Sequence, residues 1–261
     1  MSRVLLFFIT ACEWNSGAPK SDASSRLDGR HLVDARVHED HVVLNEIALS
    51  PPGGEFIELK NPTNRTIDLS SYYLADDGNY WALPVGAPTL ALSDFIVQFP
   101  ASASIAPGAI ITVAIGTAAT FTTTYAKAPT YSIAETMVKT AVPGTPTLTD
   151  SGEIIALFAW DGAGDLVKDV DLMIAGNATP QNGLVSKSET MQGAGKYATD
   201  AETIAPQATA PASGTSTKRI AAEAGSETQD GTGNGLSGDD ETSEDTSATW
   251  DSTFTAPTPG S

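Results

Sequence analysis

Short apolar runs with alternating polar positions fill the region of the chain that begins at Val42. In the first run, Val43, Asn45 and Ile47 would face one side of a strand, and the residues between them would face the other side. Two further runs follow before Asp77, and turn residues separate all three. Because a period of two residues is typical of half-buried strands, the pattern predicts an all-β chain with many turns.

The clearest predicted hairpin lies farther along the chain. Residues 153–160 and 166–174 are rich in apolar residues that favour strands, and they flank a glycine-containing turn at 161–165. The aspartates in and after this turn lack the spacing of an EF-hand calcium loop, so we interpret them as turn and solvent-facing residues.

Three long segments interrupt the strand pattern. Within residues 117–147 we expect a loop with a strand at Tyr131–Ile133 and a short helix near 135–139. Residues 176–214 are polar and turn-rich, and they predict an insertion between strands. Residues 221–247 contain many acidic residues and no lysine or arginine, so they predict an acidic loop.

Composition supports a globular β domain and limits its partners. The 261 residues are 41% hydrophobic, which is enough for a core, and their 23 glycines and 16 prolines are scattered among the apolar runs. The formal net charge of −18 would repel phosphate backbones, so we expect no nucleic acid partner. Solubility is the simplest explanation of this acidity. The single cysteine, Cys12, excludes an intramolecular disulfide.

The first twelve residues, MSRVLLFFITAC, have the organisation of an export signal. Arg3 precedes the apolar run Val4–Ile9, and Ile9-Thr10-Ala11-Cys12 matches the lipobox of bacterial lipoproteins. The match implies that residues 1–11 are a signal peptide and that Cys12 becomes the lipidated N-terminus. Acyl chains on the glyceride and on the amine would exceed the two-chain threshold for stable membrane anchoring.

An alternative to this interpretation stays open. The signal is shorter than the usual ~15–30 residues, which points to a start codon farther upstream. In the alternative, Val4–Thr10 is the N-terminal strand of a cytosolic protein. Glu13, rather than an aspartate, follows the cysteine, and this resembles the sorting signal for the outer membrane. We therefore expect a lipid-anchored protein of the bacterial cell envelope, at the outer membrane or the cell surface.

Residues 12–40 predict a flexible tether, because they are rich in serine, glycine, proline and charged residues without apolar periodicity. All three histidines, His31, His38 and His41, lie at or near its end. The run His38-Glu39-Asp40-His41 suggests a metal site, but metal ligands need a rigid element and further hydrogen bonds behind them. We therefore expect a solvated linker here.

The order of several short motifs resembles lamin tail domains, which are immunoglobulin-like β-sandwiches. The matching positions in the opening strands are Asn45, Glu46, Ile47, Glu55, Ile57, Glu58, Leu59, Asn61, Leu69 and Leu74. The phrase IAPGAIITVAI at 105–115, the pattern S-x-x-R-aliphatic at 216–220 and the terminal Thr258-Pro259-Gly260 are similar to later parts of bacterial members. The resemblance covers about residues 42–260, and it implies a sandwich at 41–261 with long loop insertions.

Five residues are expected to have structural roles. Glu46 and Glu58 lie on neighbouring predicted strands and could share a site, but hydrogen bonding at the edge of the sandwich explains them more simply. We assign structural roles to Asn61, Arg219 and Trp250 as well. Eukaryotic lamin tails have been linked to DNA, and the acidity of this chain argues against carrying that property over.

Trp250 and Phe254 alternate with polar residues and would share one face of a strand. An aromatic pair at this spacing has little reason to occur unless it is buried. We therefore predict that Trp250 packs into the sandwich and that Glu223–Asp245 is an internal loop rather than a free tail.

The sequence indicates no enzyme. The nucleophile elbow G-x-S-x-G is absent, since residues 235–239 read GLSGD, and neither a P-loop nor a dinucleotide-binding turn occurs. We expect a non-catalytic module for binding, structural or adhesive interactions with an unknown protein or polysaccharide of the envelope. A cryptic hydrolase is the weakest alternative.

A calcium-stabilised adhesion module is the other alternative. It depends on a short run of carboxylates, which supply the hard oxygen ligands that Ca²⁺ prefers. These residues are Asp239, Asp240, Glu241, Glu244 and Asp245. Apart from this possible calcium ion, we expect no cofactor.

Overall fold

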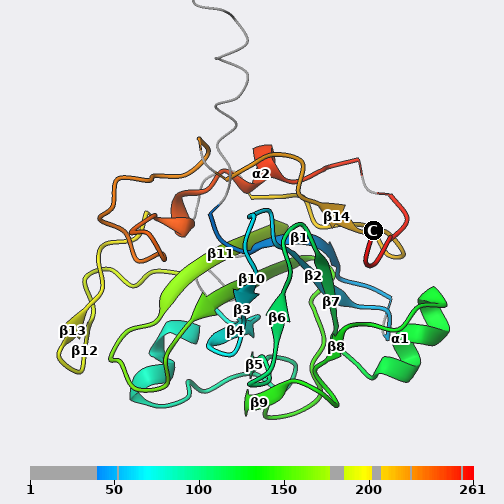
Figure 1. The fold of residues 1–261 in the computed structure, drawn as a ribbon, viewed down its shortest axis with the longest axis horizontal. Helices are drawn as coiled ribbons and strands as arrows, with labels where there is room; N and C mark the ends of the chain where they lie inside the picture. The colour runs from blue at the N-terminus through cyan, green and yellow to red at the C-terminus, as the bar shows by residue number, and fades with distance from the viewer. Residues whose placement is uncertain (1–39, 52, 177–184, 202–206, 224, 254) are drawn as a thin grey trace, which may run out of the picture. The chain divides into compact units, whose positions relative to one another are not determined.

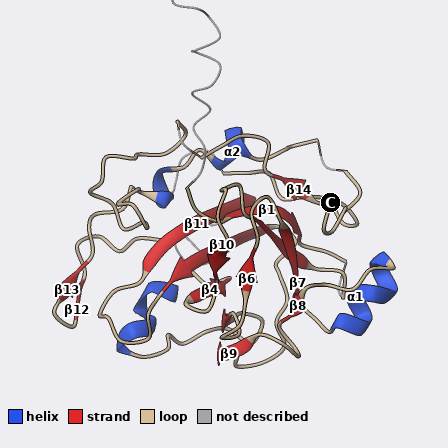
Figure 2. Ribbon diagram, in the orientation of Figure 1, coloured by secondary structure: helices blue, strands red, loops and turns tan. Residues whose placement is uncertain are grey.

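The computed structural model of the chain describes residues 40–261 apart from positions 52, 177–184, 202–206, 224 and 254. The predicted signal peptide, Cys12 and almost all of the predicted tether lie outside the described residues, as does Phe254. The described part is built mainly of β-strands, with a few short helices (Figure 1, Figure 2). It has the all-β, immunoglobulin-like sandwich architecture that the sequence predicts.

The first large sheet has five strands in the order β14-β1-β2-β7-β8. These strands are β1 (Val43–Ala48), β2 (Phe56–Lys60), β7 (Ile110–Ala114), β8 (Tyr131–Ser132) and β14 (Thr217–Lys218). Their pairs are antiparallel except for β7 with β8, which is parallel. The predicted turn after β1 is present, and Gly54 N donates a hydrogen bond to Pro51 O at 2.8 Å.

The second large sheet has five strands in the order β11-β10-β4-β5-β9. These strands are β4 (Tyr72–Ala75), β5 (Ile96–Gln98), β9 (Val138–Ala141), β10 (Gly152–Ala159) and β11 (Lys168–Gly176). The predicted hairpin is confirmed as β10 and β11. At its open end Gly176 has φ of 76°, and a Cβ there would lie 2.2 Å from Ser151 O, so only glycine fits.

The main core lies between the two large sheets. Leu44, Ile57 and Val113 come from the first sheet, and Leu74 and Leu157 from the second, and all five are fully buried. Burying a side chain of this size stabilises a protein by about 1.5–3 kcal/mol. The period-two pattern therefore marks the core-facing positions except where a bulge interrupts a strand. In β1 a register shift between Leu44 and Glu46 turns both Leu44 and Ile47 towards the core, so the expectation that these two residues face opposite sides is wrong.

Helix α1 (Ala118–Tyr125) packs on one end of the outer face of the first sheet, and the sequence did not predict it. The Thr117 hydroxyl accepts a backbone hydrogen bond in its first turn, and Phe121 packs edge-on against Phe56 with ring centroids 5.9 Å apart. The short helix expected near 135–139 is wrong. The chain turns there and enters β9, because β9 pairs with the edge of the second sheet.

The outer face of the second sheet is covered by η1 (Tyr80–Val85) and by the segment that contains β12 and β13. Tyr80 lies against Phe158, with ring centroids 4.9 Å apart. The two small sheets pair β12 (Met191–Gln192) with β13 (Gly195–Lys196), and β3 (Ile67–Asp68) with β6 (Ser104–Ile105). No helix within the described ranges is long and apolar enough to cross a membrane.

The C-terminal segment packs on the sandwich. Helices η2 (Glu241–Ser243) and α2 (Thr246–Thr249) lie beside β11. Trp250 follows α2, is 2% exposed and belongs to the main core. The strand expected to start at Trp250 is reduced to two isolated bridges, Trp250 with Arg219 and Thr255 with Ser216, because the chain bends between them at 252–253.

Replacing Trp250 with alanine should lower the free energy of unfolding by about 3–5 kcal/mol, because truncating a buried tryptophan leaves a cavity. Trp250→Phe should lose much less, since the indole Nε1 has no hydrogen-bond partner among the described residues. Urea denaturation followed by circular dichroism measures both effects. Leu92→Ala, at a side chain that is 72% exposed, is the control and should not shift the midpoint. A chain that ends at Ala222 should have no cooperative transition; an unaltered transition would show that the core closes without this segment.

Candidate functional site

A buried cluster of charged residues lies where the C-terminal segment meets β11, and Arg219 is its centre. The Arg219 guanidinium lies 2.7 Å from Asp171 of β11, 2.8 Å from Glu244 and 3.2 Å from Glu223. Its Nε donates a hydrogen bond to Leu44 O in β1 at 2.9 Å. Burial acts to lower the pKa of Arg219, but the three carboxylates outweigh burial and raise it. The arginine is therefore permanently charged.

Asp171 connects the two sheets through the same cluster. Its Oδ2 accepts a hydrogen bond from Leu44 N at 2.6 Å, and its other oxygen accepts from Arg219. Burial raises the pKa of Asp171 well above its usual range, although Arg219 opposes that shift. The expectation that Asp171 faces solvent is wrong: the C-terminal segment covers β11 there, and the side chain is fully buried. The same expectation is wrong for Asp169, which is buried against Lys187 and Tyr80.

His41 also belongs to this cluster and is not part of a solvated linker, contrary to expectation. It is only 5% exposed. Its Nε2 lies 3.2 Å from Glu223, and its Nδ1 lies 3.1 Å from Asp40. The sequence could not show this contact, because 182 positions separate His41 from Glu223.

More carboxylates gather here than Arg219 contacts. Burial raises the pKa of Glu227 to about 7. Burial also raises the pKa of Glu241 well above its usual range, and the nearby charges of Glu223 and Glu227 add to that shift. Two groups of side chains could hold a metal ion, because their candidate ligand atoms all lie within 4.8 Å of one another. One group is His41, Glu223 and Glu241, and the other is Glu227, Asp239 and Glu241.

The structure divides the residues predicted to bind calcium. Asp239 and Glu241 lie in the second metal-competent group, together with Glu227, which the sequence analysis did not select. The other three predicted ligands make contacts elsewhere. Asp240 accepts hydrogen bonds from Ala201 N and Thr242 N, Glu244 accepts from Arg219 and Thr249, and Asp245 accepts from Ser247.

Glu46 and Glu58 lie opposite each other in the β1–β2 pair and hold the end of the chain. Glu46 Oε1 accepts hydrogen bonds from Ser216 Oγ at 2.6 Å and from Thr258 N at 2.8 Å. Glu58 accepts hydrogen bonds from Asn45 Nδ2 at 2.6 Å and from Gly260 N. Both carboxylates are engaged in fixing the terminal Thr-Pro-Gly motif to the first sheet.

Asn61 has a local role at the end of β2. Its Nδ2 donates hydrogen bonds to Arg65 O at 2.7 Å and to Ile105 O at 3.0 Å, and its Oδ1 accepts from Thr63 N at 3.0 Å. The buried amide of Asn61 thus forms hydrogen bonds with backbone groups of the loop that follows β2. This structural role agrees with the one expected from the sequence.

A second buried charge cluster surrounds Lys187 on the outer face of the second sheet. The Lys187 ammonium lies 2.6 Å from Asp169 and 3.5 Å from Asp200. Tyr80 also donates a hydrogen bond to Asp169 at 2.6 Å, and Asn234 donates one to Asp200. This cluster could not be predicted from the sequence, because Lys187 lies in a polar segment that has the composition of an exposed insertion.

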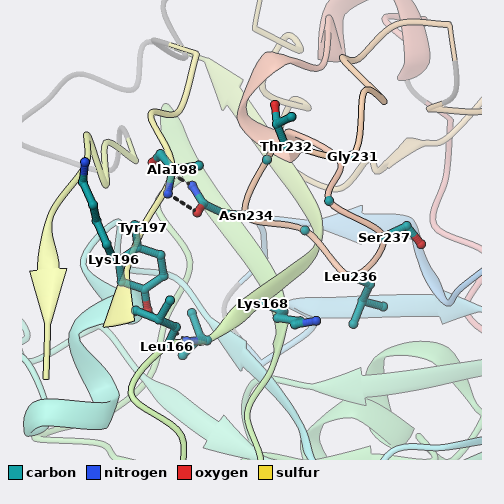
Figure 3. A pocket seen from close by; sticks show the side chains of 14 residues that line it. Leu166, Lys168, Lys196, Tyr197, Ala198, Gly231, Thr232, Asn234, Leu236 and Ser237 are labelled. Carbon is teal, nitrogen blue, oxygen red and sulfur yellow. Dashed lines mark hydrogen bonds between the residues drawn. The ribbon is translucent and has the colours of Figure 1, made fainter. Parts of the chain in front are cut away.

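A pocket of about 520 Å³ lies beside this cluster (Figure 3). One wall is the glycine-rich loop 231–238, and the other comes from β11 and from the segment of Lys196 and Tyr197. Asn234 closes one end of the pocket by exchanging hydrogen bonds with the backbone of Ala198 at 2.8 and 3.1 Å. Lys168 and Lys196 are the charged residues of the lining. The pocket therefore offers backbone amides, hydroxyls and cations, but no arrangement of a nucleophile with a base.

The family model of the Lamin Tail Domain matches residues 37–171. No curated protein matches the chain. Among solved structures, a DUF4876 family protein from Bacteroides thetaiotaomicron is similar, with 14% sequence identity and a TM-score of 0.39. The similarity covers 75% of this chain, which spans 65% of the length of that protein.

Arg219→Met should lower the free energy of unfolding by about 3–5 kcal/mol, because it leaves several buried carboxylates without their cation. Arg219→Lys should restore only part of this loss, since one ammonium cannot reproduce the planar fork of donors. Urea denaturation at neutral pH measures the difference. Arg65→Met is the matched control, because Arg65 is exposed and its guanidinium donates to the backbone oxygen of Asp40. Equal losses at the two positions would contradict a central role for Arg219.

The stability of the domain should fall as pH rises above about 5, and Glu153 should contribute to the fall. Burial raises the pKa of Glu153 from 4.5 to about 8, although the backbone amides of Thr149 and Ile154 oppose the shift. A raised folded pKa favours the folded state below pH 4.5, and this stabilisation is lost as pH rises through about 8. One such group contributes a slope of at most about 1.4 kcal/mol per pH unit. Glu153→Gln should flatten the pH dependence of the urea midpoint, whereas the exposed Glu189→Gln should not; parallel profiles would contradict this account.

Proposed function

This chain belongs to the lamin tail domain family, and on that premise we propose that it is a non-catalytic interaction module displayed on the bacterial cell envelope by a lipid anchor. The match over residues 37–171 is the observation that carries the first half of the proposal, since the family consists of non-enzymatic, immunoglobulin-like domains. That match contains β1, β2, β4, β5, β7 and β10, which build most of both large sheets.

The lipid anchor is proposed from the sequence of the first twelve residues. Ile9-Thr10-Ala11-Cys12 has the residue types that the lipobox needs, and Cys12 is the only cysteine of the chain. A thiol at this place would accept a diacylglyceryl group, and a further acyl chain on the amine would make the attachment stable. Glu13 favours delivery to the outer membrane or the cell surface over retention at the inner membrane.

The proposed partner is a protein or a polysaccharide of the envelope. A formal net charge of −18 opposes binding to nucleic acids and to anionic lipid surfaces, because both present dense negative charge. The membrane contact would therefore be made by the lipid alone, and the sandwich would remain available for the partner.

Cys12 should carry acyl groups when the protein is expressed in its native host. The protein should partition into the detergent phase of Triton X-114, incorporate an alkyne analogue of palmitate and yield an acylated N-terminal peptide in mass spectrometry. Cys12→Ser should abolish all three, whereas Ser21→Ala in the neighbouring segment should leave them unchanged. A water-soluble, unlabelled protein that still begins at Met1 would refute the lipid anchor.

The interaction role is tested separately with the full chain carrying Cys12→Ser. This protein should sediment with purified envelopes from the host in a saturable manner, and it should not sediment with sheared DNA. Binding to DNA, or the absence of saturable binding to envelopes, would contradict the proposed role without affecting the result on lipidation.

A further inference from the structure

The loop between β14 and α2 returns on itself and brings acidic residues from its two ends together. Thr228 and Asp240 form an antiparallel bridge, and Asp240 N donates a hydrogen bond to Thr228 O at 2.9 Å. The residues next to this bridge, Glu227 on one side and Asp239 and Glu241 on the other, offer carboxylate oxygens within 4.8 Å of one another. The backbone pairing thus assembles three carboxylates that the sequence separates.

Two of these carboxylates have an oxygen without a hydrogen-bond partner in the described part of the chain. Glu241 is only 3% exposed, and its Oε2 is buried without such a partner. The same is true of Glu227 Oε2, while Glu227 Oε1 accepts a hydrogen bond from Gln229. Burying a charged carboxylate is unfavourable unless a hydrogen-bond donor or a cation compensates it, so a cation bound beside these two oxygens would remove part of this cost.

The nearby cations are already engaged with other groups. The guanidinium of Arg219 forms ion pairs with Asp171, Glu223 and Glu244. Both ring nitrogens of His41 face other carboxylates, those of Asp40 and Glu223. His41 is therefore engaged within the protein, whereas Glu227 and Glu241 of the other group each have a buried oxygen without a hydrogen bond among the described residues.

We propose that Glu227, Asp239 and Glu241 bind a calcium ion that fastens this loop to the sandwich. All the candidate ligands are carboxylate oxygens, which suit a hard cation better than zinc, because zinc sites rely mainly on histidine nitrogen and cysteine sulfur. Calcium accepts six to eight oxygens in a flexible geometry, so water can complete its coordination where Glu227 is partly exposed. Mg²⁺ demands a smaller and near-ideal octahedron, which a loop-borne carboxylate cluster does not impose.

The proposed site lies next to the pocket, so a bound ion would affect the pocket wall. The ligands flank loop 228–238, and the glycine-rich part of that loop is one wall of the pocket in Figure 3. The loop folds tightly on the ligand segment: Gly235 N donates to Asp239 O at 2.8 Å, and a Cβ at Gly233 would lie 2.2 Å from the same oxygen. Calcium would therefore order the pocket wall and the acidic loop together.

Calcium titration of the full chain carrying Cys12→Ser tests the proposal, with metal-free protein and isothermal titration calorimetry. We expect saturable binding of one ion with a Kd of about 10⁻⁴–10⁻³ M or tighter, the range of extracellular calcium modules. Calcium at about 10 mM should raise Tm, and EDTA should reverse the rise, because only the folded state assembles the ligands. Mg²⁺ should bind at least about tenfold more weakly.

Substitutions of the proposed ligands test where the calcium ion binds. Glu241→Gln and Glu227→Gln should each raise the Kd for calcium at least about tenfold, since each removes a charged ligand. Asp245→Asn is the matched control: it neutralises an acidic residue of the same loop whose carboxylate instead accepts from Ser247, and it should leave the Kd unchanged. Glu227 is only partly buried, so its variant remains informative if Glu241→Gln does not fold.

Three results would overturn the assignment. The first is a folded protein that shows neither heat nor a change in Tm with calcium. The second is unchanged calcium affinity in a folded Glu227→Gln variant. The third is Zn²⁺ binding that is tighter than calcium binding and is lost in His41→Gln, which would move the site to His41, Glu223 and Glu241.

Discussion

The buried contact between Arg219 and Asp171 fixes how the two sheets of this sandwich meet. Asp171 belongs to β11 at the edge of the second sheet, and Arg219 directly follows β14 at the edge of the first. Both also bond to the backbone of Leu44 in β1, one to its nitrogen and the other to its oxygen. Removing one partner of a fully desolvated charge pair strongly destabilises the folded protein, because the other charge is left buried without compensation. This edge therefore holds only while the segment that carries Arg219 remains in place.

That dependence explains why the C-terminal segment is part of the fold and not an appendage. The Arg219 guanidinium carbon lies 5.0 Å from the ring centroid of Trp250, which combines a cation–π contact with burial of the indole in the main core. At the other end of the segment, Glu46 and Glu58 bind the backbone of the last residues. The acidic loop lies between Arg219 and Trp250, and these contacts hold it at both ends. Between the ends, its conformation depends on the interactions of its own charged residues.

The sequence predicted the elements whose cause is local. Alternation specified the strands of both sheets, and glycine in a short turn specified the β10–β11 hairpin. The order of weak motifs also singled out Arg219 and Trp250, but not their partners, because Asp171 and Arg219 are 48 positions apart in the chain. Helix α1 escaped prediction for a similar reason: its threonine-rich sequence favours helix weakly, and Phe121 is held by packing on Phe56.

The acidity of the chain also has a different meaning in the structure. As a composition it indicates a soluble surface, and many carboxylates do lie in solvent. Yet Asp171, Glu223, Glu241 and Glu244 are buried around a single arginine, and the resulting repulsion opposes folding. Natural proteins retain such an arrangement where it confers specificity or serves a ligand. In this domain the excess of buried carboxylates is concentrated in the acidic loop beside the pocket. A cation bound in that loop would reduce the repulsion between the carboxylates and so stabilise the folded state.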